Sequence, residues 1–512
     1  MTGTTGTFTS PPQSYWLAST TSTAHPALDS DITVDIAIVG GGLVGITVAY
    51  LLKQENLTVA VLEADRIGQG TTGRTTAKIT SQHSLIYSKL IKRLGLEKAR
   101  QYAQANEKAI RFIENLVNTK KIDCDFSPQA AYVYTREDQY IKAIEEEVSA
   151  AASLGIKAHF VEQSALPFEI KAAERFDNQG QFHPRKYLLT LAKDIPGGGS
   201  QIFEKTRAID FQEGRPFTII TDGGYRVRAE SVVIASHFPA YGGDGYYFAR
   251  VYPERAYALA ITAQEQFPGG IYIAAEPEGQ SLRSTPYNGG ELIIIVGGRH
   301  RTGQGPPMED HYRSLARFAE QTFSVTGTPY RWSAQDYTSL DELPYAGRLS
   351  PNSANVYVAT GFRKWGISNG TASALLLKDL IVHGESPYEA VYDPARFKAD
   401  PMIKSAVSVD VDIAVPPAHG KFERLPTGTE PAPGKAMVVA GEKGNLGLYK
   451  DEKGIVHAVN LVCTHMGCEP VWNGAELSWD CPCHGSRFTY EGDIVEGPAL
   501  KPLDSKGDRY NP

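Results

Sequence analysis

The clearest pattern of hydrophobic and polar positions lies near the N-terminus. An apolar run over residues 35–39 predicts a short buried strand, and the glycine-rich turn at 40–45 leads into an apolar helix over 43–54. A second apolar run over 57–62 predicts another strand, which ends at Glu63. Strand, turn, helix and strand in this order predict a βαβ unit that binds a dinucleotide.

The positions of the glycines and the acid fit this interpretation residue by residue. Gly40 would form the tight turn, Gly42 would admit the pyrophosphate, and Gly45 would let the helix approach the strand. The phosphates would lie at the helix N-terminus, where free N–H groups and the helix dipole favour anions. Glu63, eighteen residues after Gly45, is placed to bind a ribose 2′-hydroxyl. The alternative, a glycine-rich turn without a ligand, is disfavoured by this full context.

The middle of the chain mixes helical and strand patterns. Residues 97–153 predict amphipathic helices with charged outer faces. Residues 250–340 predict short strands, among them 257–262, 270–274 and 292–296.

Three segments have a different character. The first 30 residues contain eight threonines and little apolar periodicity, which indicates an extended arm around Trp16. A proline-rich stretch predicts a semi-rigid linker at 401–419. Residues 420–512 read as short strands and turns, which predicts an antiparallel β domain.

Composition and charge narrow the classes of function. At 512 residues, 42% hydrophobic and 21% charged, the chain is an ordinary candidate for a multidomain soluble enzyme. The net charge is −7 and no basic run occurs, which argues against a nucleic-acid partner. No Lys or Arg precedes Lys53, so we expect no signal or transit peptide. The uncharged stretch 36–52 is too short and glycine-rich for a membrane span, and we expect a cytoplasmic protein without a transmembrane segment.

Near the C-terminus two mixed Cys/His pairs stand on neighbouring loops. Cys463-x-His465 is followed after fifteen residues by Cys481-x-x-His484, and four of the five cysteines lie within residues 463–483. Two thiolates and two imidazoles suit a diiron cluster with sulfur on one iron and nitrogen on the other. The alternative is a structural zinc site, but zinc usually takes Cys-x-x-Cys followed by His-x₃₋₅-His.

This pattern resembles the Rieske [2Fe–2S] domain of cytochrome bc complexes. The resemblance implies that the cluster ligands are Cys463, His465, Cys481 and His484, and that Cys468 and Cys483 form a disulfide between the two loops. It also implies that Ser486 hydrogen-bonds a cluster sulfur and raises the reduction potential. Phe488 stands where high-potential members carry a tyrosine, so we expect an intermediate potential.

Further segments extend the nucleotide-binding pattern. Residues 68–76 read Gly-Gln-Gly-Thr-Thr-Gly-Arg-Thr-Thr, and residues 356–370 form an apolar strand and a glycine-rich loop before an apolar helix. Both resemble flavin-contacting segments of the D-amino-acid oxidase superfamily, and 204–208 and 232–236 resemble its adenine-edge and returning strands. The resemblance implies these additional FAD-binding residues: Gly70, Thr71, Thr72, Ala208, Gly361, Gly366, Asn369 and Gly370.

Taken together, the chain resembles bacterial proteins in which a glycine/sarcosine oxidase-like member of the D-amino-acid oxidase family is fused to a C-terminal Rieske domain. The resemblance implies an α/β Rossmann-like FAD-binding domain, an α+β substrate domain whose sheet roofs the substrate pocket, and an all-β Rieske domain. Residues 31–400 would form the oxidoreductase. Its FAD-binding domain would comprise about 31–96, 195–245 and 335–400, and its substrate domain about 97–194 and 246–334.

The source of electrons and the mode of flavin attachment follow from what the sequence contains. No second GxGxxG follows a strand, so electrons are expected from an organic substrate instead of a nicotinamide. Some members of the superfamily tether FAD through a histidine or a cysteine. Ala77 stands near the position of that histidine, and no cysteine occurs between Cys124 and Cys463, so we expect non-covalent FAD.

Two basic residues are candidates for catalytic roles. Arg283 lies among small polar residues and is a candidate for holding a substrate carboxylate bidentately. The alternative is a solvated or structural ion pair on a strand. Lys364 lies in the loop beside the expected flavin, where an ammonium would stabilise reduced flavin. The alternative is an ordinary surface lysine.

The favoured hypothesis is an FAD-dependent amine or amino-acid dehydrogenase. Hydride transfer to flavin would give an imine, and electrons would pass singly to the Rieske cluster and to an external acceptor. One alternative is an oxidase that uses dioxygen and keeps the cluster for structure or regulation. Another is a non-catalytic electron-transfer protein, against which an enclosed pocket argues. The substrate, the acceptor and the oligomeric state remain open at this stage.

Overall fold

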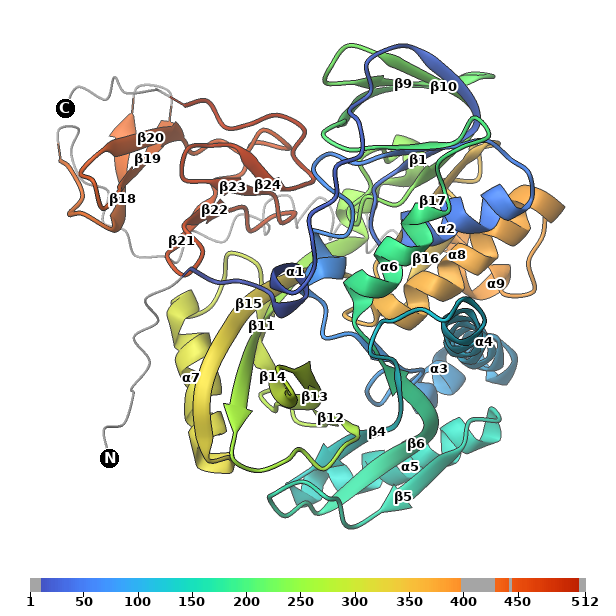
Figure 1. Ribbon diagram of the computed structural model, residues 1–512, viewed down its shortest axis with the longest axis vertical. Coiled ribbons are helices and arrows are strands. Elements are labelled where there is room, and N and C mark those ends of the chain that lie inside the picture. The colour runs from blue at the N-terminus through green and yellow to red at the C-terminus, as the bar shows by residue number, and fades with distance from the viewer. Residues whose placement is uncertain (1–10, 397–428, 442–443, 506–512) are drawn as a thin grey trace.

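The computed structural model describes residues 11–396, 429–441 and 444–505. The predicted linker at 401–419 lies outside the described residues. In Figure 1 the described chain forms three lobes, with the C-terminal lobe packed against the other two. Within these ranges, no helix is long and apolar enough to cross a membrane.

The predicted FAD-binding domain is built on a sheet whose central strands are parallel. Its order is β16-β17-β10-β1-β2-β7, and the β8–β9 hairpin extends from β10. Strands buried on both faces need continuous apolar runs, and this explains the uninterrupted burial of 36–39 and 59–62. The strands are β1 (Ile32–Val39), β2 (Val59–Leu62), β7 (Gln201–Phe203), β8 (Ala208–Gln212), β9 (Phe217–Thr221), β10 (Arg226–Ile234), β16 (Tyr345–Arg348) and β17 (Val356–Thr360).

Helices cover this sheet and position its loops. A Cβ atom built on Gly370 of α8 would lie 3.1 Å from the Val44 side chain of α2, so the absence of a side chain lets the two helices pack closely. The helices of this domain are α2 (Leu43–Gln54), α6 (Pro184–Lys193), α8 (Gly366–His383) and α9 (Glu389–Tyr392). The predicted βαβ unit is therefore present in the expected order.

The predicted substrate domain is a nine-stranded sheet with helices on its outside. Its order is β15-β11-β14-β13-β12-β4-β6-β3, with β5 paired to β6. The predicted amphipathic segment 97–153 contains α4 (Leu96–Lys120) and α5 (Ile141–Ser153), and α3 (Tyr87–Leu94) precedes it, within the segment predicted for FAD binding. On the same sheet packs α7 (Met308–Thr322). The strands are β3 (Lys78–Ile79), β4 (Ser127–Thr135), β5 (Ala158–Val161), β6 (Ala172–Gln181), β11 (Val251–Ala263), β12 (Ile271–Ala274), β13 (Ser281–Tyr287), β14 (Gly290–Arg301) and β15 (Val325–Ser339).

The predicted domain limits do not coincide with the limits of the sheet. β15 runs through the predicted boundary between residues 334 and 335, because its antiparallel ladder with β11 continues from Val325 to Ser339. β3 also belongs to this sheet, although it falls within the segment predicted for FAD binding. Backbone pairing carries a strand past the point where the sequence pattern changes.

The C-terminal domain contains two small antiparallel sheets, as predicted. One has the order β18-β19-β20 and the other β21-β22-β23-β24. In Figure 1 the four-stranded sheet lies nearer to the rest of the molecule than the three-stranded sheet. The strands are β18 (Lys435–Gly441), β19 (Gly444–Lys450), β20 (Val456–Asn460), β21 (Val471–Asn473), β22 (Ser478–Asp480), β23 (Arg487–Thr489) and β24 (Ile494–Glu496).

The N-terminal segment is less extended than the sequence predicted. Residues 15–18 form a short helix, α1, and Trp16 is fully buried. The Ser14 hydroxyl donates to the Gly73 carbonyl at 2.6 Å, and the Trp16 indole donates to the Thr75 carbonyl at 2.6 Å. The arm therefore supports the 68–76 loop.

Candidate active site

A cavity of about 520 Å³ opens at the carboxyl ends of the parallel strands. This is the edge of an α/β sheet at which ligands bind, and the volume lies in the range of cofactor pockets, about 300–1,000 Å³. Nine residues predicted from the sequence line it: Gly40, Gly42, Glu63, Gly70, Thr71, Thr72, Ala208, Lys364 and Gly366. The sequence therefore predicted nine of the 36 residues that line the cavity.

The glycine-rich turn has the geometry that a pyrophosphate site requires. Gly40 has φ +110°, and a Cβ on Gly45 would overlap the Gly40 carbonyl oxygen, so neither position accepts a side chain. A Cβ on Gly42 would approach nothing closer than 3.4 Å, which leaves open space at the start of α2. Gly42 thus gives an anion direct access to the helix N-terminus.

Two polar side chains organise this turn. Glu63 accepts hydrogen bonds from the Gly41 N–H at 2.7 Å and the Asp65 N–H at 2.9 Å. Burial nevertheless raises the pKa of Glu63 above its usual value. Thr72 accepts from the Leu43 N–H at 3.0 Å and so satisfies a donor in the first turn of α2. The turn and the 68–76 loop therefore hold each other in place.

Four other predicted FAD-binding residues do not line the cavity. Gly45 and Gly370 allow close backbone packing, and Gly361, with φ +76°, faces Ser339 and Val251. Asn369 is buried, and its amide donates to the Tyr102 hydroxyl at 3.3 Å. These positions support the cavity wall from behind, and their direct contact with FAD stays a prediction.

The Arg283 side chain is placed differently from the sequence prediction. Its guanidinium is buried outside the cavity lining and donates to the backbone carbonyls of Thr76, Ala77 and Ser284 at 2.8–3.2 Å. It also stacks over Trp16, 5.4 Å from the ring centroid. Four of the five N–H donors of the Arg283 guanidinium are engaged in this way. No pair of adjacent N–H groups is left to bind a carboxylate bidentately. The assignment of Arg283 as a substrate ligand is therefore corrected to a structural role beside β3.

The Lys364 ammonium is buried at the cavity, in contrast to that of a surface lysine, although the residue as a whole is half-buried. Lys364 has φ +69° and the preceding Arg363 has φ +51°, an uncommon backbone conformation for side-chain-bearing residues. The Asp336 carboxylate accepts a hydrogen bond from the Lys364 backbone N–H. The ammonium itself has no hydrogen-bond partner in the described part of the chain. Burial lowers its pKa to about 7, against the opposing field of Glu254.

A histidine that sequence reasoning missed joins the cavity to the C-terminal domain. His237, with φ +70°, lines the cavity and lies 3.0 Å from Asp336 and 3.7 Å from Glu496 of β24. Its Nδ1 is also 3.2 Å from the Thr71 hydroxyl. Burial alone would lower the pKa of His237, but the two carboxylates outweigh it and raise the pKa to about 9. No motif marks such a residue, because its partners come from three distant segments.

The predicted cluster ligands meet on two adjoining loops. Cys463 and Cys481 are buried, free thiols within hydrogen-bond reach of each other, and this contact lowers the pKa of Cys463. The rings of His465 and His484 are 4.9 Å apart between centroids, and Nδ1 of His484 has no partner among the described residues. Two thiols and two imidazoles converge here, one of each per loop. This donor set fits a [2Fe–2S] cluster.

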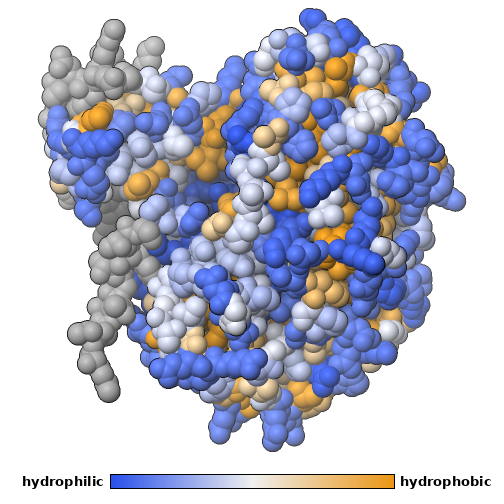
Figure 2. Space-filling view, in the orientation of Figure 1, coloured by the Kyte–Doolittle hydropathy of each residue, from blue (hydrophilic) through white to orange (hydrophobic). Residues whose placement is uncertain are grey.

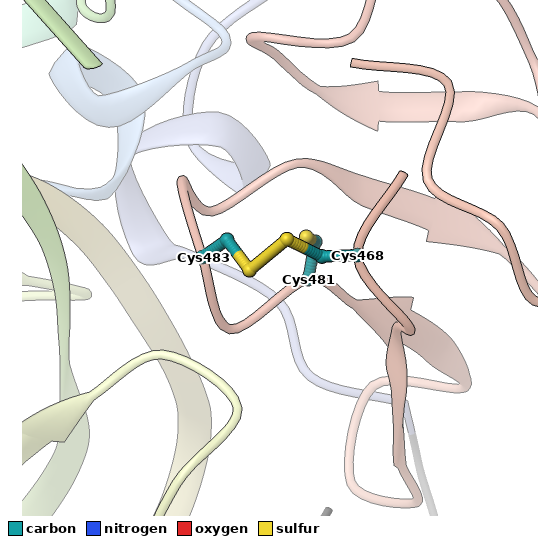
Figure 3. Close-up of side chains that lie close together, drawn as sticks. All are labelled: Cys468, Cys481 and Cys483. Atoms are coloured by element: carbon teal, nitrogen blue, oxygen red, sulfur yellow. A yellow bond between two sulfur atoms is a disulfide. The ribbon is translucent and has the colours of Figure 1, made fainter. Parts of the chain in front are cut away.

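The predicted disulfide between the two loops is confirmed. Cys468 and Cys483 are joined, and Figure 3 shows Cys481 immediately beside them. The sulfur atoms of these three residues lie within 4.8 Å of one another. Since the disulfide occupies two of them, only Cys481 remains as a thiolate donor. The Ser486 hydroxyl lies against the Cys463 thiol, and Phe488 is fully buried nearby.

Comparison with known proteins supports both the dinucleotide cavity and the Cys/His site. Residues 35–380 match the family described as FAD dependent oxidoreductase, and residues 425–506 match the Rieske [2Fe-2S] domain. The chain belongs to the FAD dependent oxidoreductase family. It binds FAD, and its C-terminal Rieske domain binds a 2Fe–2S cluster. The expected fold class is confirmed.

Three relatives illustrate the match. The Bacillus subtilis protein YhfW, named as a Rieske 2Fe-2S iron-sulfur protein, is 40% identical over 96% of this chain and 97% of its own. Gamma-glutamylputrescine oxidoreductase of Escherichia coli is 25% identical over 72% of this chain and 88% of its own. The crystal structure of glycine oxidase from Geobacillus kaustophilus has a TM-score of 0.59 and 20% identity, and covers 72% of this chain and 99% of that chain.

The Rieske domain of this oxidoreductase closes one side of the cavity. Residues 494–500, from β24 onward, belong to the cavity wall. Phe238 lines the same cavity, and its ring lies 5.6 Å from the ring of His465 and 6.2 Å from that of His484. Hydrophobic side chains also gather where the Rieske lobe meets the larger body in Figure 2. Phe238 therefore lies between the cavity and both of the predicted histidine ligands.

Proposed function

We propose that this protein is an FAD-dependent dehydrogenase of an amine or amino acid that passes electrons singly to its Rieske cluster and on to an external acceptor. The single observation that carries the proposal is the shared wall of the two cofactor sites. Rieske residues 494–500 line the flavin cavity, and Phe238 contacts both that cavity and the histidine ligands. When bound, FAD accepts a hydride from the substrate C–H bond and the cluster accepts one electron at a time.

The residues of the chain supply orientation and charge. Lys364 presents a cation to the cavity, which would favour the reduced, more negative flavin. Thr71, His237 and Asp336 form a hydrogen-bonded series that begins at the cavity and can hold a proton there. Phe238 excludes water between the two sites.

The substrate class is inferred from relatives. The E. coli relative is named for gamma-glutamylputrescine and the solved structure for glycine, and both names denote amines. We therefore propose a small-molecule amine or amino acid as substrate. The external acceptor is a protein or a quinone, and no residue in the structure identifies it.

Anaerobic reduction with a panel of amines and amino acids tests the proposal. The correct substrate should bleach the flavin and then the cluster in the same sample, with iron and acid-labile sulfide measured beforehand. A flavin that bleaches while the cluster stays oxidised for minutes would show that intramolecular transfer is not the role of the cluster.

Attachment of FAD is proposed to be non-covalent. Ala77 has only a methyl side chain, and the chain has no cysteine between Cys124 and Cys463. Acid precipitation should release all yellow colour into the supernatant, and a yellow pellet would contradict this.

A second candidate function is an oxidase, and the buried Lys364 ammonium favours it. A cation without a hydrogen-bond partner among the residues that the structure describes would also stabilise negative charge that develops as dioxygen is reduced to peroxide. Stoichiometric peroxide during aerobic turnover, with the cluster remaining oxidised, would support this function over the dehydrogenase.

A further inference from the structure

The flavin cavity is built from two domains. Its floor comes from the glycine-rich turn and the 68–76 loop, and residues 494–500 of the Rieske domain form part of its wall. A ligand that fills the cavity must therefore contact both. This arrangement links occupancy of the cavity to the position of the Rieske domain.

The Rieske domain docks on one face of β15, at contacts outside the cavity. Gln335 donates to the Gly485 carbonyl at 2.8 Å, and the Tyr337 hydroxyl donates to the His484 carbonyl at 2.9 Å. Ser333, two residues earlier, donates to the Glu476 carboxylate. Alternate residues of a strand share a face, so these three form one row.

A buried ion pair fixes the same interface. Arg255 of β11, which pairs with Gln335 across the ladder, is fully buried and donates to both carboxylate oxygens of Glu476 at 2.8 Å. Arg487 of the Rieske domain donates to the same carboxylate. These cations lower the pKa of Glu476 far below its usual value, although burial opposes them. Separation of the domains would leave the buried Arg255 guanidinium without its carboxylate, whereas Glu476 would keep Arg487, so the docked position is favoured by the pairing of Arg255.

We propose that FAD binding and docking of the Rieske domain are one coupled equilibrium, in which docking contacts that never touch FAD set its affinity. The Rieske domain completes the site, so only the docked form binds FAD at full strength. Binding of FAD in turn holds the domain in place, because coupling between two sites is reciprocal. This inference is independent of the direction in which electrons flow.

The test measures FAD affinity in the full-length protein with its cluster retained. FAD is removed and titrated back, and quenching of flavin fluorescence gives Kd. Glu476→Gln preserves shape and removes the charge that Arg255 needs, and it should raise Kd about tenfold, within the roughly 5- to 150-fold range of such couplings. Glu491→Gln, an exposed carboxylate 3.8 Å from His457 within the Rieske domain, is the matched control and should leave Kd unchanged.

A second variant distinguishes loss of docking from misfolding of the Glu476→Gln protein. Tyr337→Phe keeps the ring and removes the hydroxyl that donates to the His484 carbonyl at 2.9 Å, so it weakens docking with little change of side-chain volume. It should raise Kd in the same direction. Hydrogen exchange of the segment 333–337 reports docking directly and should be faster in both variants and in the FAD-free wild type.

Two results would overturn the proposal. In one, hydrogen exchange at 333–337 is faster in the variants but their Kd for FAD stays within twofold of wild type. Docking would then be lost while FAD binding is unchanged. The other is unchanged exchange in both variants, which would show that these contacts do not hold the domain.

Discussion

At the scale of single residues, the Ser486 hydroxyl is placed where it would tune the cluster. Its side chain lies against the Cys463 thiol and is fully buried, where a hydrogen bond to sulfur stabilises negative charge. The ligands around it were predictable because cysteine and histidine types and spacing define them. Phe488, at the position where the resemblance to high-potential Rieske domains implies a tyrosine, adds no second hydroxyl.

The first prediction concerns this hydroxyl. Ser486→Ala should lower the reduction potential of the cluster by on the order of 50 mV, because one hydrogen bond contributes about 1 kcal/mol and 59 mV is a tenfold change for one electron. Titration followed by the electron paramagnetic resonance signal of the reduced cluster measures it. Ser478→Ala, whose hydroxyl bonds Asp480, is the control and should leave the potential in place. An equal shift in both variants would contradict the assignment.

The second prediction concerns Lys364. Since burial lowers its pKa to about 7, the ammonium is charged below pH 7 and neutral above it. The flavin potential of wild type should exceed that of Lys364→Met by roughly 20–60 mV at pH 6, which corresponds to about 1–3 kcal/mol for two electrons. The difference should disappear by pH 8.5. Spectroelectrochemistry over this range measures it, and a constant difference would show that Lys364 does not titrate near 7.

The residues that sequence reasoning misplaced have a common physical cause. Arg283 was predicted to bind a carboxylate because a guanidinium can do so. In the structure its N–H groups donate to backbone carbonyls, and no local sequence pattern predicts these bonds. His237 went unnoticed because its carboxylate partners lie 99 and 259 positions away along the chain. Residue type predicts chemistry well where the partner is local, and poorly where a tertiary contact supplies it.

At the scale of elements, the βαβ unit was predictable because each part has a local reason. Continuous apolar runs predicted β1 and β2. The glycine at position 45 predicted that α2 packs closely against the turn that begins at Gly40. The extent of β15 was not predictable, because pairing with β11 determines where it ends. Nor could the sequence show that Ser333, Gln335 and Tyr337 face the Rieske domain. Their spacing of two residues is the same in any strand with one buried face.

The third prediction tests the contact between α2 and the turn. In Gly45→Ala the new methyl group overlaps the Gly40 carbonyl, so the backbone must shift. We expect about 2–3 kcal/mol of lost stability and substoichiometric FAD in the purified protein. Gly290→Ala, whose Cβ meets its nearest atom at 3.7 Å, is the control. Urea unfolding and the ratio of flavin to protein absorbance measure the two effects, and full flavin content in Gly45→Ala would contradict the role.

At the scale of the whole molecule, the two cofactor sites are parts of one structure. Both lie against the β11–β15 ladder, and His237 bridges Asp336 of the substrate domain and Glu496 of the Rieske domain. The presence of three domains could be predicted from the motifs. Their mutual orientation could not, because it depends on contacts between surfaces that no single segment encodes.

The fourth prediction concerns pH and the bridge at His237. Its pKa in the folded protein, about 9, exceeds the usual value near 6.5, so its stabilisation is complete below pH 6.5 and is lost as pH rises through 9. The difference in unfolding free energy between wild type and His237→Gln should therefore shrink by up to about 3 kcal/mol from pH 6 to pH 9.5. Urea titrations at the two pH values measure it. A difference that does not change with pH would rule out an imidazolium at this position.

The row of side chains on β15 has a consequence for engineering. A foreign cluster-carrying module without a carboxylate at the place of Glu476 would leave Arg255 unpaired, although its loops would still offer backbone carbonyls to Gln335 and Tyr337. Such a chimera would keep its cluster, bind FAD more weakly and fail to assemble as a working pair. To exchange one Rieske domain for another, the face of β15 and the neighbouring Arg255 would have to be redesigned to match the new domain.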